Sequence, residues 1–254
     1  MYPHSLLWHY LWLAPLALQV VIVTTMIRRK LCQEFPMFLV YTIFQVVLNA
    51  TLFVLDHAPS VTAYQYRYAE WVDEVGSIVL RFAVIQEVFS VVFRSYPALK
   101  ELGTLVFRWT IAVLVLVAVA VAAYGAGGYG PGLLSGLALL DRAVAIVQCG
   151  LLLFLFLFSS YFGLSWRHYV FGIALGLGVF SSMQLATAAV QAEMGLLVPG
   201  SEVLDFIVMG TYHCSVLIWL FYLLVPERAR GTARRVPSHN LEEWNNALQR
   251  LLQQ

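Results

Sequence analysis

Residues 36–55 read PMFLVYTIFQVVLNATLFVL and contain no charged side chain. A helix that crosses the hydrocarbon core of a bilayer needs about 20 mostly apolar residues, and this stretch has that length and character. Three of its polar side chains, Tyr41, Gln45 and Asn49, recur every four residues and so lie on one side of a helix. The stretch therefore predicts a membrane-spanning helix with one polar stripe.

The same apolar character extends over most of the chain of 254 residues, of which 61% are hydrophobic and only 11% charged. A soluble domain carries about 25% charged residues, so composition indicates an all-α, polytopic membrane helix bundle. Hydrophobic runs predict about seven transmembrane helices at 5–27, 35–56, 67–93, 105–125, 133–162, 168–192 and 203–225. Residues 1–226 are then the transmembrane domain, and residues 227–254 form a basic tail.

The distribution of basic residues predicts the orientation of these spans. On one side of the membrane lie Arg28, Arg29, Lys30, Arg94, Lys100, Arg108, Arg167, Arg228, Arg230, Arg234, Arg235 and Arg250. On the other side lies Arg67 alone. Because lysine and arginine collect in cytoplasmic loops, we expect the N-terminus outside and the C-terminus in the cytoplasm. Arginine strongly outnumbers lysine, which is typical of a GC-rich bacterial genome, so we expect the bacterial inner membrane.

No basic segment precedes the first apolar run, as it would in a cleaved signal peptide, so we interpret that run as a retained span.

Ionisable and amide side chains inside the spans are the main functional signal. Such groups are costly in lipid, and they face the bundle interior or water. Glu70, Glu74 and Arg81 of the third span share one helical stripe, and the second, fifth, sixth and seventh spans carry polar stripes of their own. Most of these groups fall in the predicted outer half of the membrane. The candidate ligand-binding residues are Asn49, Glu70, Glu74, Arg81, Asp141, Gln184, Asp205 and His213.

Each candidate also has a purely structural interpretation. Arg81 can form a buried ion pair with Glu74 or Asp141, which would hold helices together without binding a ligand. Gln184 can serve as an interhelical hydrogen-bonding group, and His213 can be a hydrogen-bonded core histidine. The sequence leaves these alternatives open.

Several functional classes find no support in the sequence. The only lysines, Lys30 and Lys100, lie in predicted loops, which argues against a retinal Schiff base inside the spans. The motifs H-E-x-x-H, G-x-S-x-G and the P-loop are absent, and the three cysteines show no C-x-x-C spacing. We therefore expect no cofactor, no metal and no nucleic-acid partner, and we favour a protein that is not an enzyme.

Two runs carry a resemblance to known proteins. The run FPMFLVYTIF at 35–44, after the basic residues 28–30, and the run FAVIQEVF at 82–89, with YPAL at 96–99, resemble uncharacterised bacterial seven-helix membrane proteins. The layout of the spans is also similar to the seven-helix sensor modules that precede histidine kinases. The resemblance covers general layout and implies no substrate. Only a short tail follows the seventh span, so we expect no kinase output domain.

We therefore predict a membrane-embedded binding or sensory module with an outward-facing, polar, acidic pocket for a small polar or cationic ligand. In the tail, Asn240 with Glu243 three residues later resembles a capping box and predicts an amphipathic helix to about residue 252. This helix can lie on the inner leaflet, contact a cytoplasmic partner, or mediate self-association. The alternative function is a transporter, or a membrane subunit of a transport or biogenesis complex.

Overall fold

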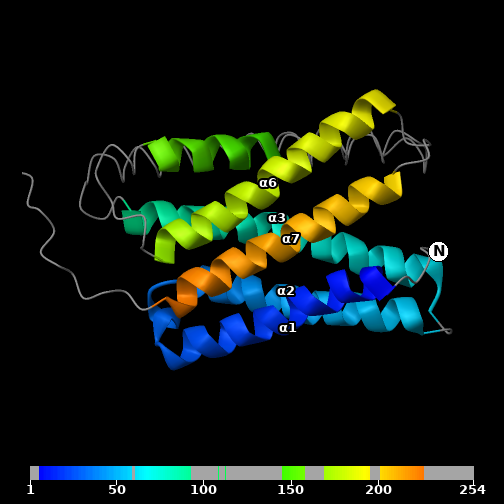
Figure 1. The fold of residues 1–254 in the computed structure, drawn as a ribbon, viewed down its shortest axis with the longest axis horizontal. Coiled ribbons are helices and arrows are strands. Elements are labelled where there is room, and N and C mark those ends of the chain that lie inside the picture. Colours follow the sequence, from blue (N-terminus) through cyan, green and yellow to red (C-terminus); the bar gives the residue numbers. More distant parts are fainter. Residues whose placement is uncertain are drawn as a thin grey trace, which may run out of the picture.

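The computed structural model describes residues 6–58, 61–92, 108, 112, 145–157, 169–194 and 201–225. Over these ranges it is all-helical (Figure 1). The five long helices are α1 (Leu6–Arg28), α2 (Pro36–His57), α3 (Ala63–Val92), α6 (Tyr169–Met194) and α7 (Ser201–Leu224), with a 3₁₀ turn, η1, at Leu31–Gln33 and a shorter apolar helix at Ala145–Leu157. The predicted span at 105–125, except residues 108 and 112, lies outside the described residues, as do the candidate Asp141 and the predicted tail helix.

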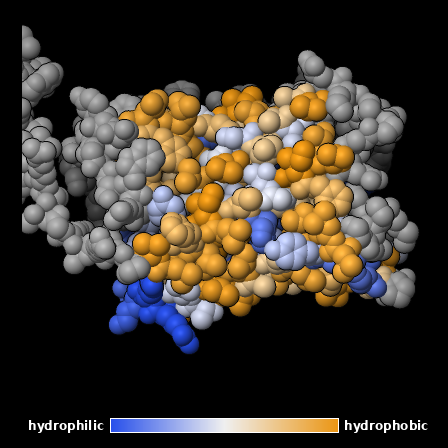
Figure 2. Space-filling model, viewed as in Figure 1, coloured by the Kyte–Doolittle hydropathy of each residue, from blue (hydrophilic) through white to orange (hydrophobic). Residues whose placement is uncertain are grey.

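Each of these five long helices is long and apolar enough to cross a membrane. Together they indicate a multi-pass membrane protein, and they confirm helices at the first, second, third, sixth and seventh predicted spans. Figure 2 shows hydrophobic surface over much of the visible face, with hydrophilic atoms gathered at the end of the bundle where α1 turns into α2. That turn carries the exposed residues Arg28, Arg29 and Lys30. Seven spans and the outside position of the N-terminus remain predictions.

Helix α3 begins earlier than the sequence predicts, at Ala63 rather than residue 67. A reciprocal pair of hydrogen bonds fixes this start: the Thr62 N–H donates to Gln65 Oε1 at 3.1 Å, and the Gln65 N–H donates to Thr62 Oγ1 at 3.4 Å. This pairing is a capping box, which satisfies backbone donors that a helix start leaves without partners. At 30 residues, α3 is about 45 Å long, longer than the hydrocarbon core of about 30 Å.

The five long helices form a closed ring in the order α1, α2, α3, α6, α7 and back to α1. The first and last of them are therefore neighbours, as Figure 1 shows. The helix Ala145–Leu157 packs against this ring: Ser181 of α6 donates a hydrogen bond to Gln148 Oε1 at 3.1 Å, and the rings of Phe89 and Phe154 stack at 5.8 Å.

The half of the ring that ends at the α1–α2 turn is filled with apolar side chains, and we call it the core half. It includes the end of α1, the start of α2, the end of α3, the start of α6 and the end of α7. Its buried residues include Ile22, Met26, Phe35, Phe38, Phe82, Ile85, Val88, Ile173, Leu177, Trp219 and Leu223. Dispersion contacts of this kind drive helix association in lipid, where burial of apolar surface contributes little.

Glycines bring α6 close to α7 in the core half. A Cβ added at Gly176 would lie 2.2 Å from Trp219 Nε1, and one at Gly172 would lie 2.3 Å from the ring of Tyr222. The Trp219 indole N–H donates to the carbonyl oxygen of Ile173 at 3.2 Å. The spacing of these glycines is the G-x-x-x-G pattern that allows close approach of membrane helices.

Two charged side chains bind helix ends in the core half. The carboxylate of Glu87, on α3, accepts the backbone N–H groups of Met37 and Phe38 at 2.9 and 3.0 Å, in the first turn of α2. The guanidinium of Arg29 donates to the last carbonyls of α7 at 2.7 and 3.1 Å. A carboxylate at a helix start and a cation at a helix end both complement the helix dipole, so these two residues fix the position of α2 and α7.

Candidate functional site

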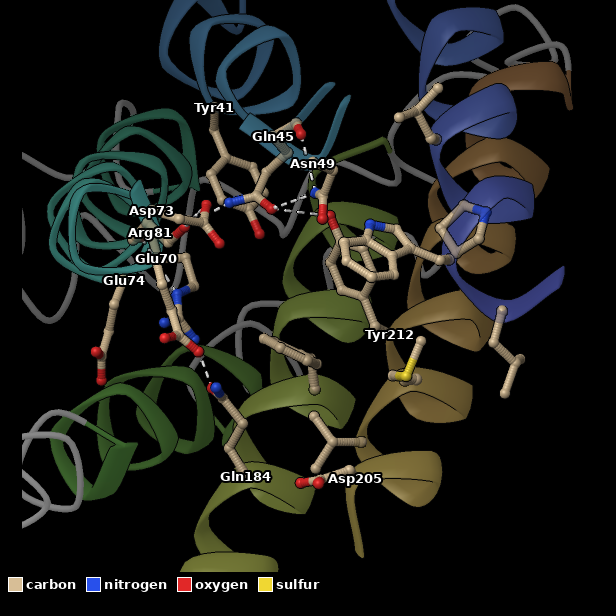
Figure 3. A pocket seen from close by; sticks show the side chains of 18 residues that line it. Tyr41, Gln45, Asn49, Glu70, Asp73, Glu74, Arg81, Gln184, Asp205 and Tyr212 are labelled. Atoms are coloured by element: carbon tan, nitrogen blue, oxygen red, sulfur yellow. Dashed lines mark hydrogen bonds between the residues drawn. The ribbon is translucent and has the colours of Figure 1, made fainter. Parts of the chain in front are cut away.

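The opposite half of the ring encloses a cavity of about 560 Å³, and we call this the cavity half. Pockets of about 300–1,000 Å³ are typical of small-molecule sites. All five long helices contribute side chains, from the start of α1, α3 and α7 and the end of α2 and α6. The polar lining residues are Tyr41, Gln45, Asn49, Glu70, Asp73, Glu74, Ser77, Arg81, Gln184, Asp205 and Tyr212 (Figure 3). The apolar lining includes Trp12 and Phe180.

The cavity brings together most of the residues that the sequence singles out. Six of the candidates line it: Asn49, Glu70, Glu74, Arg81, Gln184 and Asp205. They come from α2, α3, α6 and α7, so residues far apart in the sequence meet in one space. The candidate Asp141 lies outside the described residues.

The lining carries an excess of negative charge. Among the described residues that line the cavity, Glu70, Asp73, Glu74 and Asp205 bear carboxylates, whereas Arg81 bears the single positive charge. A concave site lined by charges of one sign concentrates ions of the opposite sign. The described lining therefore stabilises positive charge inside the cavity.

A chain of hydrogen bonds forms one wall of the cavity and links four helices. The Gln19 amide of α1 donates to the Tyr212 hydroxyl of α7, which donates to Gln45 Oε1 of α2 at 3.3 Å. The Gln45 amide then donates to the Ser77 hydroxyl of α3, which donates to Asp73 Oδ1 at 3.3 Å. Along this chain each residue donates to the next one, and the last acceptor is the carboxylate of Asp73. Such a connected network holds polar side chains in fixed positions.

Arg81 lies in the middle of α3, and only 4% of its surface is exposed. Its Nε donates to the carbonyl oxygen of Ser77 at 3.3 Å, its Nη1 donates to Gln184 Oε1, and its guanidinium lies 5.5 Å from the centre of the Phe180 ring. Within the described ranges, no carboxylate oxygen comes within 4.0 Å of it. The expected ion pair with Glu74 is therefore not formed, because seven residues separate the two Cα atoms by about 10.5 Å along the helix.

His213 is not among the residues that line this cavity, so its role in ligand binding stays a prediction. Its ring lies 5.7 Å from that of Tyr10 on α1, and its Nδ1 atom is buried without a hydrogen-bond partner among the described residues. Successive residues of a helix point about 100° apart. It is the preceding residue, Tyr212, that points into the cavity (Figure 3).

The candidate set derived from the sequence omits six residues that line the cavity: Trp12, Tyr41, Gln45, Asp73, Ser77 and Tyr212. It also omits Gln19, which donates a hydrogen bond to Tyr212. Gln19 is the one amide side chain within the apolar run of α1, and such a residue inside a span is a signal of function or of helix contact.

By its fold, the chain is a multi-pass helical membrane protein with a polar, acidic cavity in one half of the bundle. Comparison with known proteins finds no matching protein-family model, no matching curated protein and no matching solved structure. In the part of the chain that the structure describes, no group of three or more His, Cys, Asp or Glu side chains could hold a metal ion.

Proposed function

We propose that this protein is a membrane-embedded binding or sensory module that takes up a small, positively charged molecule into the cavity half. One observation carries the proposal: four helices, α2, α3, α6 and α7, direct polar side chains into a single cavity whose described lining has four carboxylates and one guanidinium. Both the field of such a site and the cost of desolvating an anion disfavour a purely anionic ligand.

The cavity opens outward in this proposal because of where the basic residues lie. Arg28, Arg29 and Lys30 belong to the turn at the core half, and by the positive-inside rule that end faces the cytoplasm. Reporter fusions at Gly128 and Gln254 test the orientation and the span number, and they should report outside and inside respectively. The same location for both fusions would contradict the seven-span topology.

The apolar packing of the core half favours a binding module over a transporter. Side chains such as Phe38, Ile85 and Trp219 are fully or almost fully buried between the cavity and the cytoplasmic end. The described residues of that layer offer a bound molecule no polar route. Transport would require these packed helices to separate during each cycle, so we keep a transporter, or a subunit of a transport or biogenesis complex, as the second candidate.

On the cytoplasmic side, we propose that the core-half end and residues 227–254 form the contact face for a partner protein or for a second copy of the chain.

Cysteine accessibility tests the outward cavity. In a background with Cys32, Cys149 and Cys214 replaced by serine, Asn49→Cys and Gln184→Cys should react with a membrane-impermeant thiol reagent added from outside. A short alkylamine such as n-butylamine should slow both reactions, because its ammonium group occupies the acidic cavity. Val88→Cys, in the fully buried apolar core, is the matched control and should not react.

Two outcomes would overturn the proposal. Either neither cavity cysteine reacts from outside, or no alkylamine slows the reaction at any concentration that leaves the control unchanged. Purified protein in liposomes separates the two candidates: accumulation of labelled n-butylamine inside the vesicles would favour the transporter, whereas saturable binding without uptake would favour the binding module.

A further inference from the structure

The guanidinium of Arg81 differs from every other charge of the described cavity lining. It is the one cation there, it is almost fully buried, and no carboxylate oxygen of the described residues lies within 4.0 Å of it. A buried charge without a counter-ion is strongly unfavourable, and in proteins such charges are paired or strongly hydrogen-bonded. The structure therefore leaves a position beside Arg81 where a negative group would be stabilised.

The hydrogen bonds of Arg81 leave donors for such a group. A guanidinium has five N–H donors in a planar fork. One of them binds the Ser77 carbonyl and one binds Gln184, so the guanidinium, which lines the cavity (Figure 3), retains N–H groups that these two bonds do not use. The Cζ atom of Arg81 lies over the Phe180 ring, 5.5 Å from its centre, at a distance where a cation is attracted by the ring. A carboxylate matches this fork in a bidentate geometry, as planar oxyanions generally do.

Carboxylates stand about one helical turn away on the same helix. The side chain of Arg81 extends toward the start of α3, as side chains on a helix do, so that its Nε reaches the level of Ser77. From there to Asp73 is four residues, or about 6 Å along the axis, and Glu70 lies one further turn beyond. The cavity thus presents one cationic position and one anionic position at a separation of about 6 Å or slightly more.

We propose that the ligand is dipolar: a small molecule that carries both an ammonium group and a carboxylate, separated by several bonds. Its carboxylate binds the guanidinium fork of Arg81, and its ammonium group binds between Asp73 and Glu70. This inference rests on the proposed binding function and makes the ligand class narrower, because a simple cation would leave Arg81 without a carboxylate partner among the described residues. It also explains why an acidic cavity contains a buried arginine.

The test compares matched ligands on the full-length protein in lipid nanodiscs. The probes are ω-amino acids, H₃N⁺–(CH₂)n–COO⁻ with n from two to five, each paired with the alkylamine in which methyl replaces the carboxylate. Hydrogen bonds to charged groups are the strong ones. We therefore expect at least one ω-amino acid to bind about tenfold more tightly than its alkylamine, as measured by calorimetry or by quenching of tryptophan fluorescence.

Two variants assign the two ends of the ligand. Arg81→Met should reverse the ratio, so that the alkylamine binds more tightly than the ω-amino acid, because the added carboxylate then meets only negative charge. Glu70→Gln should weaken both ligands to a similar degree and leave the ratio unchanged. If Arg81→Met does not give monodisperse protein, Arg81→Lys serves instead, since it keeps the charge but loses the fork and should reduce the ratio.

The outcomes separate this inference from the function on which it rests. If the alkylamines bind and no ω-amino acid binds more tightly than its partner, the dipolar ligand is refuted and the cationic site stands. If the ratio survives Arg81→Met or Arg81→Lys, or falls in Glu70→Gln, the assignment of the two ends is refuted. If neither kind of ligand binds at any length, the proposed binding function itself fails.

Discussion

Substitution of Gly176 by alanine should destabilise the bundle at the contact between α6 and α7. The added Cβ would lie 2.2 Å from Nε1 of Trp219 and 2.7 and 2.8 Å from two of its ring carbons. Since ordinary contacts begin near 3.5 Å, the indole would have to retreat by about 1 Å. Trp219 is 1% exposed and is a rigid ring inside the core half, so no flexible chain end is available to absorb that shift.

The expected magnitude follows from three terms. Overpacking of a filled core costs about 1–3 kcal/mol. Displacement of the indole also weakens its N–H bond to Ile173, and a buried donor without an acceptor costs about 1–3 kcal/mol. Alanine is about 1 kcal/mol more favourable than glycine inside a helix. We therefore expect Gly176→Ala to lower the free energy of unfolding by about 2 kcal/mol or more.

Gly210→Ala is the matched control, because no atom of the described residues lies within 4 Å of a Cβ at that position of α7. It should leave the free energy of unfolding unchanged or raise it by up to about 1 kcal/mol. Both variants can be measured by titration with SDS in mixed micelles, with loss of helical circular dichroism as the signal. Trp219→Phe, which makes the neighbouring ring smaller, should restore part of the stability of Gly176→Ala.

The test lies in the contrast between the two variants, because Gly176→Ala should lower the free energy of unfolding whereas Gly210→Ala should leave it unchanged or raise it. If Gly176→Ala proved as stable as Gly210→Ala, the close packing of α6 on the indole would be wrong. If Trp219→Phe gave no relief, the cost would have some origin other than the indole.

The same titration tests three polar contacts. Glu87→Gln places an amide donor against the backbone donors at the start of α2 and should cost about 1–2 kcal/mol; Gln86→Ala, at an exposed position of the same turn, should cost less than about 0.5 kcal/mol. Arg29→Met removes the cation at the end of α7 and should cost about 1 kcal/mol, more than the exposed Arg28→Met. Ser77→Ala interrupts the hydrogen-bond chain and should cost about 1–3 kcal/mol, because a buried amide donor loses its acceptor. A variant as stable as its control, or as the wild type for Ser77→Ala, would show that the contact is not stabilising.

Much of the cavity could be predicted from the sequence, for a definite physical reason. Helical periodicity fixes the face on which a side chain lies, and position within an apolar run fixes its depth. Asn49, Glu70 and Gln184 therefore had to lie at similar depth on faces that avoid lipid. Whether these faces meet in a single cavity depends on how each helix is rotated about its own axis relative to its neighbours. The periodicity of one segment does not determine that rotation.

The individual partners could not be predicted in the same way. Of the two carboxylates that the sequence offers Arg81, Glu74 is not its partner, and Asp141 lies outside the described residues; the guanidinium binds Gln184 and lies 5.5 Å from the centre of the Phe180 ring. Hydrogen bonds require donor and acceptor within about 3 Å, and such distances depend on how α3 and α6 cross. Glu87 shows the same limit: its sequence position inside a span gives no sign that it binds the start of α2.

The sequence by itself determined that this chain is a helical membrane protein, because apolar runs of spanning length have no other stable arrangement in lipid than helices with their backbone bonds satisfied internally. It also determined which side chains must avoid lipid. Tertiary structure alone decided that α1 closes the ring against α7, that Tyr212 rather than His213 points into the cavity, and that Arg81 has no ion-pair partner among the described residues. These features depend on contacts between segments far apart in the chain, and the energy of such contacts changes over about 1 Å.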